Sequence, residues 1–281
     1  MHTTRFAPSP TGWLHLGHAY AALTAESAAG GGRCLLRIED LDATRARPEF
    51  EAAIESDLRW LGLSWPEPVL RQSQRMAPYQ AAVDTLAAAA LLYPCFCTRR
   101  QIAAEIAQAG QAPHGVSGSL YPGICRGMTL QERERRVAAG QLHVLRLDVA
   151  AAAASVGPLN FTELGSGPGG ESGVIAVVPA LLGDIVLARR DVGAAYHLAV
   201  VVDDAFQQVS LVTRGNDLFA ATHVQRLLQA LLGLPEPQYV HHRLILDAQG
   251  NKLSKRDGPV TLRELRGGGM TAADVRRQLG F

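Results

Sequence analysis

The chain has 281 residues, of which 47% are hydrophobic and 19% charged, and this ordinary globular composition excludes an intrinsically disordered protein. Its formal net charge of +1 gives no global field that would attract a polyanion, so any nucleic acid would have to be held by a local patch. No apolar run reaches the ~18–20 residues needed to cross a bilayer. The N-terminus also lacks the apolar core of a secretory signal, so we expect a cytoplasmic protein without membrane contact.

The first part of the chain alternates between strand and helix patterns. In order, these are a strand at 5–8, a helix at 16–29 closed by three glycines, a buried apolar strand at 34–38, and helices at about 48–61 and 75–91. Alternation of this kind predicts an α/β fold with a Rossmann-like, doubly wound parallel sheet. Residues 1–94 would supply the first half of that Rossmann-like domain.

The alternation breaks between residues 95 and 182, where cysteines, glycine-rich turns and an arginine-rich helix near 129–139 occur. This break predicts an insertion domain at 95–182, a second half of the Rossmann-like domain at 183–235, and a final segment at 236–281. Within these parts we expect strands at 183–188, 195–202, 208–213 and 239–246, a helix at 217–232, and a short helical tail at 261–281.

A glycine cluster at 165–170 suggests a phosphate-binding loop at first sight. It lacks the following lysine and serine or threonine, and no strand clearly leads into it. A surface loop is therefore the expected structure for this segment.

Two short motifs carry candidate chemistry. His15-Leu-Gly17-His18 lies at a predicted strand-to-helix turn, where helix N–H groups can bind phosphate and Gly17 allows close approach of a nucleotide. The chain has 25 arginines but only two lysines, Lys252 and Lys255, which stand three residues apart after the last predicted strand. Ammonium groups there could neutralise charge that develops between the α- and β-phosphates of a nucleotide. Taken separately, the histidines could simply cap a helix and the lysines could form a solvated basic loop.

Taken together, the two motifs resemble the HIGH and KMSKS signatures of class I aminoacyl-tRNA synthetases. The segments Arg5-Phe-Ala-Pro-Ser-Pro-Thr-Gly and Arg37-Ile-Glu-Asp-Leu-Asp resemble the glutamyl branch of that family. Only 25 residues follow Arg256, too few to bury an independent core, so no anticodon-binding domain is expected. The chain therefore resembles most closely the truncated glutamyl-Q tRNA(Asp) synthetase family.

The resemblance implies an activity and a set of site residues. It implies a ligase that activates L-glutamate with ATP and Mg²⁺ to glutamyl-adenylate and transfers the glutamate to the queuosine base in the anticodon of tRNA(Asp). Separately, we expect the protein to be a monomer. The implied catalytic residues are His15, His18, Lys252 and Lys255, and the implied ATP contacts are His15, Gly17, His18 and Lys255. The implied glutamate pocket, in which arginine forks can bind carboxylates with paired hydrogen bonds, is formed by Arg5, Ala7, Ser9, Glu39, Tyr196 and Arg214.

Three other functions stay open from the sequence. The nearest is a minimal glutamyl-tRNA synthetase that charges a tRNA 3′ end. A small nucleotidyltransferase could also carry a His-x-Gly-His motif, and a zinc-bearing RNA-binding module would need no catalysis.

Two groups of arginines could contact RNA phosphates or form solvated helix faces: those at 126, 133, 135 and 136 and those at 263, 266, 276 and 277. None is therefore assigned to tRNA contact.

Three cysteines, Cys95, Cys97 and Cys125, offer soft metal ligands in a chain without a disulfide pattern. A closed structural zinc site takes four ligands, and the residues alone leave Tyr121 and His114 as candidates for the fourth. The family resemblance implies Tyr121, in the pattern Cys-x-Cys…Tyr-x-x-x-Cys, and one structural Zn²⁺ per chain. Cys34 lies in an apolar strand and is expected to be a core residue.

Overall fold

A computed structural model describes residues 1–98, 100–101, 114–115, 118–189, 193–246 and 260–281. The helices are α1 Leu16–Ala28, α2 Pro48–Trp60, α3 Met76–Ala88, α5 Leu130–Ala138, α6 Val149–Val156, α7 Tyr196–Phe206, α8 Phe219–Leu231, α9 Leu262–Gly267 and α10 Ala272–Leu279, with single 3₁₀ turns η1 Gln72–Gln74, η2 Pro179–Leu182 and η3 Asn216–Leu218. The strands are β1 Thr3–Phe6, β2 Arg33–Ile38, β3 Leu70–Arg71, β4 Leu92–Cys95, β5 His114–Gly115, β6 Gly118–Ser119, β7 Val144–Leu147, β8 Asn160–Glu163, β9 Gly173–Ala176, β10 Val186–Arg189, β11 Gly193–Ala194, β12 Leu211–Gly215 and β13 Gln238–His242.

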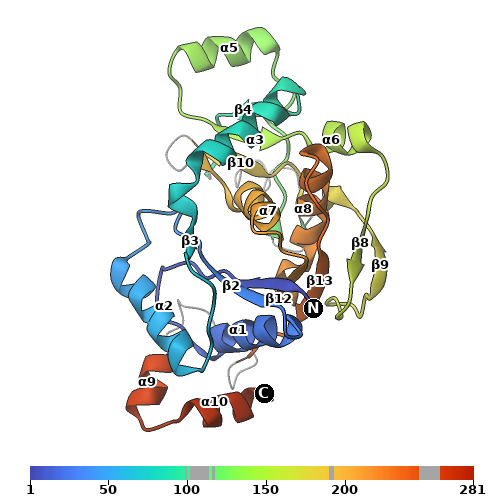
Figure 1. Cartoon of the computed structure of the whole chain (residues 1–281). Helices are drawn as coiled ribbons and strands as arrows, with labels where there is room; N and C mark the ends of the chain where they lie inside the picture. Colours follow the sequence, from blue (N-terminus) through green and yellow to red (C-terminus); the bar gives the residue numbers. More distant parts are fainter. Residues whose placement is uncertain (99, 102–113, 116–117, 190–192, 247–259) are drawn as a thin grey trace.

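The expected parallel sheet is present in two joined parts. One part has the order β1-β2-β3 and the other the order β12-β13-β8-β9, and only the β8–β9 pair is antiparallel. Two hydrogen bonds of 3.0 Å between Thr3 and Ser210 bring the start of β1 beside the start of β12. In Figure 1, β2, β12 and β13 lie at the centre of the molecule with α1, α7 and α8 around them. The α/β architecture with a parallel sheet is thus confirmed.

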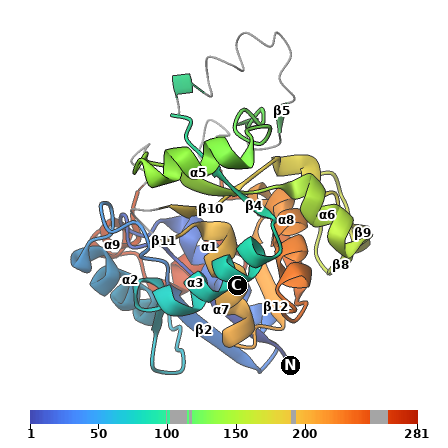
Figure 2. The same ribbon diagram turned by 90° about the horizontal axis from the view of Figure 1, so that it is seen from above.

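A second sheet has the order β11-β10-β7-β4, and its pairs are antiparallel. Its strands come from both sides of the expected boundaries at residues 95 and 182, and β8 and β9, expected within the insertion, extend the parallel sheet instead. Viewed from above, α5 lies over this part of the molecule (Figure 2). The domain boundaries drawn from the sequence stay a prediction.

Several helices begin at residues whose side chains satisfy exposed backbone N–H groups. Thr129, Thr261 and Thr271 accept hydrogen bonds from the third residue of α5, α9 and α10, and the last two helices also have an acidic residue that returns a bond to the cap. Pro48 stands at the first position of α2, where its missing N–H costs nothing, and Glu49 and Glu51 lie in the first turn. Local sequence therefore fixes these starts.

The segment from Tyr196 to Phe206 is a helix, so the strand predicted at 195–202 was wrong. Its run Leu198-Ala-Val-Val is buried on every side, with each of the four residues at most 2% exposed. A short apolar run that is buried all round has no periodicity to distinguish helix from strand, and the valines favoured the strand. The correction matters because α7 carries Tyr196 at its first turn and two acidic residues, Asp203 and Asp204, near its end.

Two apolar cores support the sheet. One contains residues of α3, α6, α7 and α8, among them Leu86, Leu198 and Leu227. The other contains residues of α1, β2 and α2 together with Leu262, Val275 and Leu279 of the last two helices, which Figure 1 shows beside α1 and α2. Among the described residues no helix is both long and apolar enough to span a membrane.

Candidate functional site

A cavity of about 630 Å³ opens at the carboxyl ends of β1, β2, β12 and β13. In open parallel sheets this edge is where ligands bind. The cavity is lined by every described residue that the sequence assigned to glutamate or ATP: Arg5, Ala7, Ser9, His15, Gly17, His18, Glu39, Tyr196 and Arg214. The fold therefore brings together residues that are up to 209 positions apart in the chain.

The two histidines of the first motif cap α1 and face each other. The backbone N–H of Gly17 donates to Nδ1 of His15 (3.1 Å), and the backbone N–H of His15 donates to Nδ1 of His18 (3.2 Å). Their ring centroids lie 3.9 Å apart. Because each Nδ1 accepts a hydrogen bond, a neutral ring carries its proton on Nε2. The capping role considered from the sequence is real, and it fixes the tautomer with which each ring can donate to an anion.

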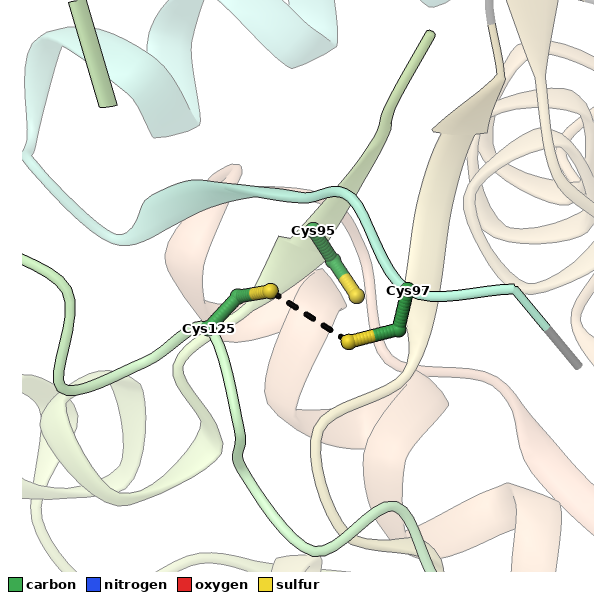
Figure 3. Close-up of side chains that lie close together, drawn as sticks. All are labelled: Cys95, Cys97 and Cys125. Atoms are coloured by element: carbon green, nitrogen blue, oxygen red, sulfur yellow. Dashed lines mark hydrogen bonds between the residues drawn. The ribbon is translucent and has the colours of Figure 1, made fainter. Parts of the chain in front are cut away.

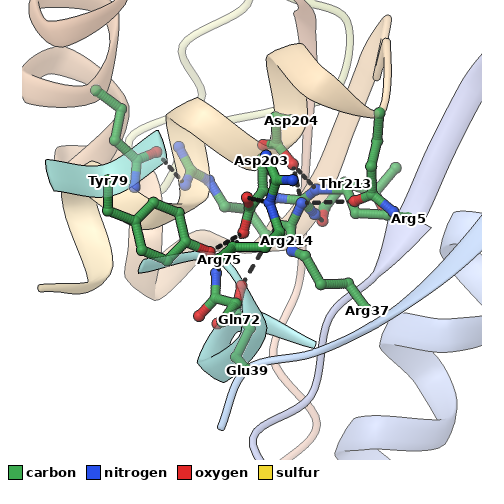
Figure 4. A network of polar contacts seen from close by, with 12 residues as sticks. Arg5, Arg37, Glu39, Gln72, Arg75, Tyr79, Asp203, Asp204, Thr213 and Arg214 are labelled. Carbon is green, nitrogen blue, oxygen red and sulfur yellow. Dashed lines mark hydrogen bonds and ion pairs between the residues drawn. The ribbon is translucent and has the colours of Figure 1, made fainter. Parts of the chain in front are cut away.

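Arg5, which lines the cavity, and Arg37 share one buried carboxylate, that of Asp204 (Figure 4). Arg5 Nε donates to Asp204 Oδ1 (3.0 Å), Arg37 Nη1 donates to the same oxygen (2.7 Å), and Arg5 Nη1 donates to the carbonyl of Thr213 (3.1 Å). Burial would raise the pKa of Asp204, but the two guanidinium groups outweigh it and lower that pKa. The positive charge of Arg5 is thus already balanced by Asp204, and only some of its guanidinium N–H groups remain for a ligand.

Glu39 is the acid at the end of β2 and its side chain is 11% exposed. Burial raises its pKa, opposed by the nearby Arg37 and Arg5. Arg37 itself is fully buried, and although burial acts in the opposite direction, Asp204 and Glu39 raise its pKa. Two arginines and two carboxylates therefore balance on this side of the cavity.

Arg214, at the end of β12, is 6% exposed and has a different environment. Its Nε donates to His241 Nε2 (3.2 Å), and its two Nη atoms donate to Thr222 Oγ1 and Gln225 Oε1 (2.6 Å each). No carboxylate forms an ion pair with it among the residues that the structure describes. A buried cation with neutral partners is costly unless an anion completes its environment, so this position is suited to bind an anionic group.

A second buried carboxylate, Asp203, stands next to Asp204 on α7 but points the other way. It accepts hydrogen bonds from Arg75 Nε (2.6 Å), Tyr79 OH (2.6 Å) and Gln72 Nε2 (3.1 Å). Burial and the hydrogen bond to Asp203 raise the pKa of Tyr79. Asp203 therefore ties α7 to α3 and η1 behind the cavity (Figure 4).

The second motif lies outside the described residues, since Lys252 and Lys255 fall within 247–259. The described residues on either side belong to the cavity region. Ile245 lines the cavity, and Thr261 forms an isolated bridge with His15 while the next residue donates its N–H to Leu14 (2.8 Å). The roles expected for both lysines stay predictions.

The three expected cysteines form a cluster at the end of β4. The sulfur atoms of Cys95, Cys97 and Cys125 all lie within 4.8 Å of one another, and Figure 3 shows them directed toward one point. The Tyr121 oxygen lies 3.3 Å from Cys95 Sγ and 3.7 Å from Cys97 Sγ, and Cys97 Sγ lies 3.4 Å from Cys125 Sγ. Three thiols and one phenol at these separations could hold a tetrahedral zinc ion. The competing residue, His114, has a side chain outside the described ones.

Sequence reasoning missed four buried residues around the cavity: Arg37, Asp204, His241 and Glu163. Arg37 lay within a segment that carried the family resemblance, and for both Arg37 and Asp204 a charged residue next to an apolar run was the available signal. His241 and Glu163 gave no such signal, because only the pairing of β8, β13 and β12 brings them to Arg214. The glycine cluster at 165–170 is a largely exposed loop, as expected, but β8 leads directly into it and Gly167 is buried, which the sequence did not predict.

Comparison with known proteins agrees with this geometry. The family described as tRNA synthetases class I (E and Q), catalytic domain, matches residues 2–277. A Rhodobacter capsulatus protein named glutamyl-Q tRNA(Asp) synthetase is 50% identical over 99% of this chain and 99% of its own length. A Nitratidesulfovibrio vulgaris protein of the same name is 42% identical over 99% of this chain and 85% of its own.

Solved structures show the same fold in longer proteins. A glutamate tRNA ligase from Elizabethkingia meningosepticum, crystallised with its amino acid, is 28% identical and superposes with a TM-score of 0.73 over 92% of this chain. This chain spans about half of that one, 52% of its length. The chain is therefore a ligase that belongs to the class I tRNA synthetase (E and Q) family, in the group whose curated members are named glutamyl-Q tRNA(Asp) synthetase.

Proposed function

We propose that this ligase activates L-glutamate with ATP and transfers the glutamate to queuosine in the anticodon of tRNA(Asp). The glutamate α-carboxylate attacks the α-phosphorus of ATP, which gives glutamyl-adenylate and pyrophosphate. A hydroxyl of the queuosine cyclopentenediol then attacks the activated carbonyl, which forms an ester, breaks the bond to the phosphate and releases AMP and the hydroxyl proton. The observation that carries the proposal is the cavity itself, which is lined both by a buried arginine without an acidic partner among the described residues and by two histidines at a helix start.

Glutamate presents two carboxylates and one ammonium, and the cavity offers partners for each. Arg214 supplies a buried cation whose contacts are neutral, and Arg5 keeps two N–H groups beyond the three that bind Asp204 and Thr213. Glu39 supplies the carboxylate for the ammonium. Since Arg5 is already balanced by Asp204, Arg214 is the stronger attraction for an added negative charge.

ATP would lie at the start of α1. His15 and His18 line the cavity at the N-terminus of this helix, and Gly17 between them allows a nucleotide to approach the backbone. Lys252 and Lys255 are proposed to stabilise charge on the departing pyrophosphate, without covalent catalysis. Mg²⁺ bound with the ATP would supply further neutralisation of the phosphates.

One zinc ion is proposed at Cys95, Cys97, Tyr121 and Cys125. Arg146 stacks over the Tyr121 ring at 3.8 Å, so a cation lies beside a ligand set that binds metal in deprotonated form. The cluster joins β4 to the segment before α5. The site would therefore hold these two segments together rather than take part in the reaction.

Two assays test the reaction. ATP–pyrophosphate exchange should depend on glutamate and proceed without tRNA, and Lys255→Ala should lower it at least ~10-fold, which is ~1.4 kcal/mol of barrier. Normal exchange by that variant would contradict the role given to the lysine.

Labelled glutamate should be incorporated into tRNA(Asp) that contains queuosine and not into tRNA(Asp) that lacks it. Incorporation that is independent of queuosine would favour the alternative, charging of a tRNA 3′ end.

Metal analysis of the purified protein tests the zinc site. The wild type should hold about one zinc per chain, with Cys97→Ser and Tyr121→Phe holding less. Cys34→Ser is the matched control, because Cys34 is a cysteine on β2 outside the cluster. A wild-type protein without zinc, or a Tyr121→Phe variant that retains it fully, would contradict the proposed ligand set.

A further inference from the structure

Three polar side chains form a row across the ends of three adjacent parallel strands. Arg214 on β12 pairs in register with His241 on β13. Glu163 on β8 pairs with Tyr239, which lies two residues before His241 and so has its side chain on the same face of the sheet. Arg214 is the end of this row that lines the cavity.

Glu163 fixes the protonation state of His241. The Glu163 side chain is fully buried, its Oε1 accepts the backbone N–H groups of Gly165 and His241 (2.9 Å each), and its Oε2 lies 2.5 Å from His241 Nδ1. An ionised carboxylate has acceptors only, so His241 carries its proton on Nδ1 and donates it to Oε2. Its Nε2 then has a lone pair, and Arg214 Nε donates to it at 3.2 Å.

Burial keeps this row in one charge state. Burial lowers the pKa of His241, more than its hydrogen bond to Glu163 raises it, so the ring is neutral between Arg214 and Glu163. The carboxylate of Glu163 thus reaches the guanidinium of Arg214 only through a neutral imidazole, so Arg214 has no direct ion pair with it. The Nη atoms of Arg214, held by Thr222 and Gln225, keep one N–H each for another acceptor.

Gly165 explains part of the glycine cluster that the sequence left without a role. A Cβ at this position would lie 2.7 Å from the backbone oxygen of His241 and 2.9 Å from Glu163 Oε1, which is too close for any side chain. Only glycine lets the backbone after β8 pass so near β13 and donate its N–H to Glu163.

We propose that Glu163 and His241 are positioning residues that orient Arg214 for the substrate carboxylate, an inference that rests on the proposed function. Glu163 selects the tautomer of His241, and His241 accepts from Nε of Arg214. The guanidinium plane is thereby held while its remaining N–H groups face an anionic ligand. Neither Glu163 nor His241 lines the cavity, so both act through Arg214.

Glu163→Gln is the sharpest test, because it keeps the size of the side chain and reverses one hydrogen bond. The amide oxygen replaces Oε1 and keeps both backbone donors, so the amide N–H₂ faces His241 Nδ1. His241 must then carry its proton on Nε2, where it opposes the N–H of Arg214. We expect the KM for glutamate to rise about tenfold or more, while the KM for ATP stays within about twofold.

A matched pair at His241 separates orientation from packing. His241→Gln can place an amide oxygen near the Nε2 position and accept from Arg214, whereas His241→Asn reaches only toward Glu163. The KM for glutamate should rise about tenfold in His241→Asn and less than about threefold in His241→Gln. Tyr79→Phe, which loses a buried hydroxyl on Asp203 away from the cavity, is the control and should leave both KM values near those of the wild type.

The experiment is read in two ways. In ATP–pyrophosphate exchange, equal increases in both KM values, or unchanged kinetics in Glu163→Gln, would overturn the positioning role. Nitrogen-15 NMR of the imidazoles should show the Nδ1–H tautomer for His241 in the wild type and the Nε2–H tautomer in Glu163→Gln. If His241 had the same tautomer in the wild type and in Glu163→Gln, Glu163 would not control that tautomer and the positioning role would be overturned. This measurement does not require an active enzyme. A wild type that shows no glutamate-dependent exchange would overturn the proposed function instead, so the two failures are distinguishable.

Discussion

Two clusters of arginines and carboxylates in this molecule have nearly the same bond lengths and opposite surroundings. In the buried cluster, Arg5 and Arg37 lie 3.0 and 2.7 Å from Asp204, with side chains that are 6%, 0% and 8% exposed. In the exposed cluster on α5, Arg135 and Arg136 lie 2.7 and 2.6 Å from Glu132, and Arg135 is 71% exposed. Distance alone therefore does not distinguish the two clusters.

The two clusters differ in whether water can solvate the charge that is left when one residue of an ion pair is removed. Water can solvate every member of the α5 cluster, whose residues are only three and four positions apart on one helix. The buried cluster joins β1 and β2 to α7, across 167 to 199 positions of the chain, and its charged side chains are at most 8% exposed to water. Loss of one buried member leaves the others uncompensated, which is more costly than loss of the bond itself.

The largest effect is expected for Asp204→Asn. The change keeps the shape and removes the charge that balances the two arginines, so we expect a loss of about 3–5 kcal/mol in the free energy of unfolding. Urea titration followed by circular dichroism measures it. A loss of less than about 1 kcal/mol in the free energy of unfolding would contradict the expected difference between the buried cluster and the exposed cluster on α5.

The next effect is a pH dependence that comes from His197. Burial, with a smaller effect of Arg214, lowers the pKa of His197 to about 4 from an ordinary value of 6.5. Because the unfolded state then binds the proton more readily, stability is full above pH 6.5 and falls as the pH drops toward 4, by up to about 3 kcal/mol. His197→Gln should lose less stability than the wild type between pH 7.5 and 4.5. Parallel curves for the two proteins would contradict the shift.

A smaller loss should follow Tyr79→Phe, which removes one of three donors from the other buried carboxylate. The Tyr79 hydroxyl donates to Asp203 at 2.6 Å, and Arg75 and Gln72 stay bound in the variant. We expect a decrease of about 1–3 kcal/mol in the free energy of unfolding, again by urea titration. A decrease as large as that of Asp204→Asn would show that losing a donor and losing a charge are equivalent here.

No change in the urea midpoint is expected for Glu132→Gln on α5. Hydrogen bonds from Arg135 and Arg136 lower the pKa of Glu132 to about 2, but the group is exposed and its partners are solvated. The same variant measured at low and high salt should stay close to the wild type. A clear destabilisation would mean that the helix surface behaves like the interior.

The sequence predicted the elements whose ends carry local signals. Helix α2 begins at Pro48 as expected, and α5 was placed within one residue at each end. The error at α7 arose where burial on all sides removed the periodic signal, and the strand expected at 239–246 ends at His242. Local signals such as caps and proline could be recognised in the sequence, whereas burial by distant parts of the chain could not.

The candidate site was predictable where motifs and resemblance named residues, and all nine described ones line the same cavity. Its supporting charges were not predictable, because each depends on a partner far away in the chain. The role of Asp204 depends on its contacts with Arg5 and Arg37, and the role of Glu163 depends on its contact with His241. A single sequence contains no distances between such residues.

The last two helices have a consequence for any shortened version of this protein. Val275 and Leu279 are 0% and 4% exposed in the same core as Leu23 of α1, and Arg276 binds Glu26 at 2.8 Å. A chain cut before α9 would leave the apolar side of α1 open to water, although every described residue that lines the cavity precedes the cut. Truncation at this end would therefore be expected to yield aggregated protein rather than a smaller enzyme.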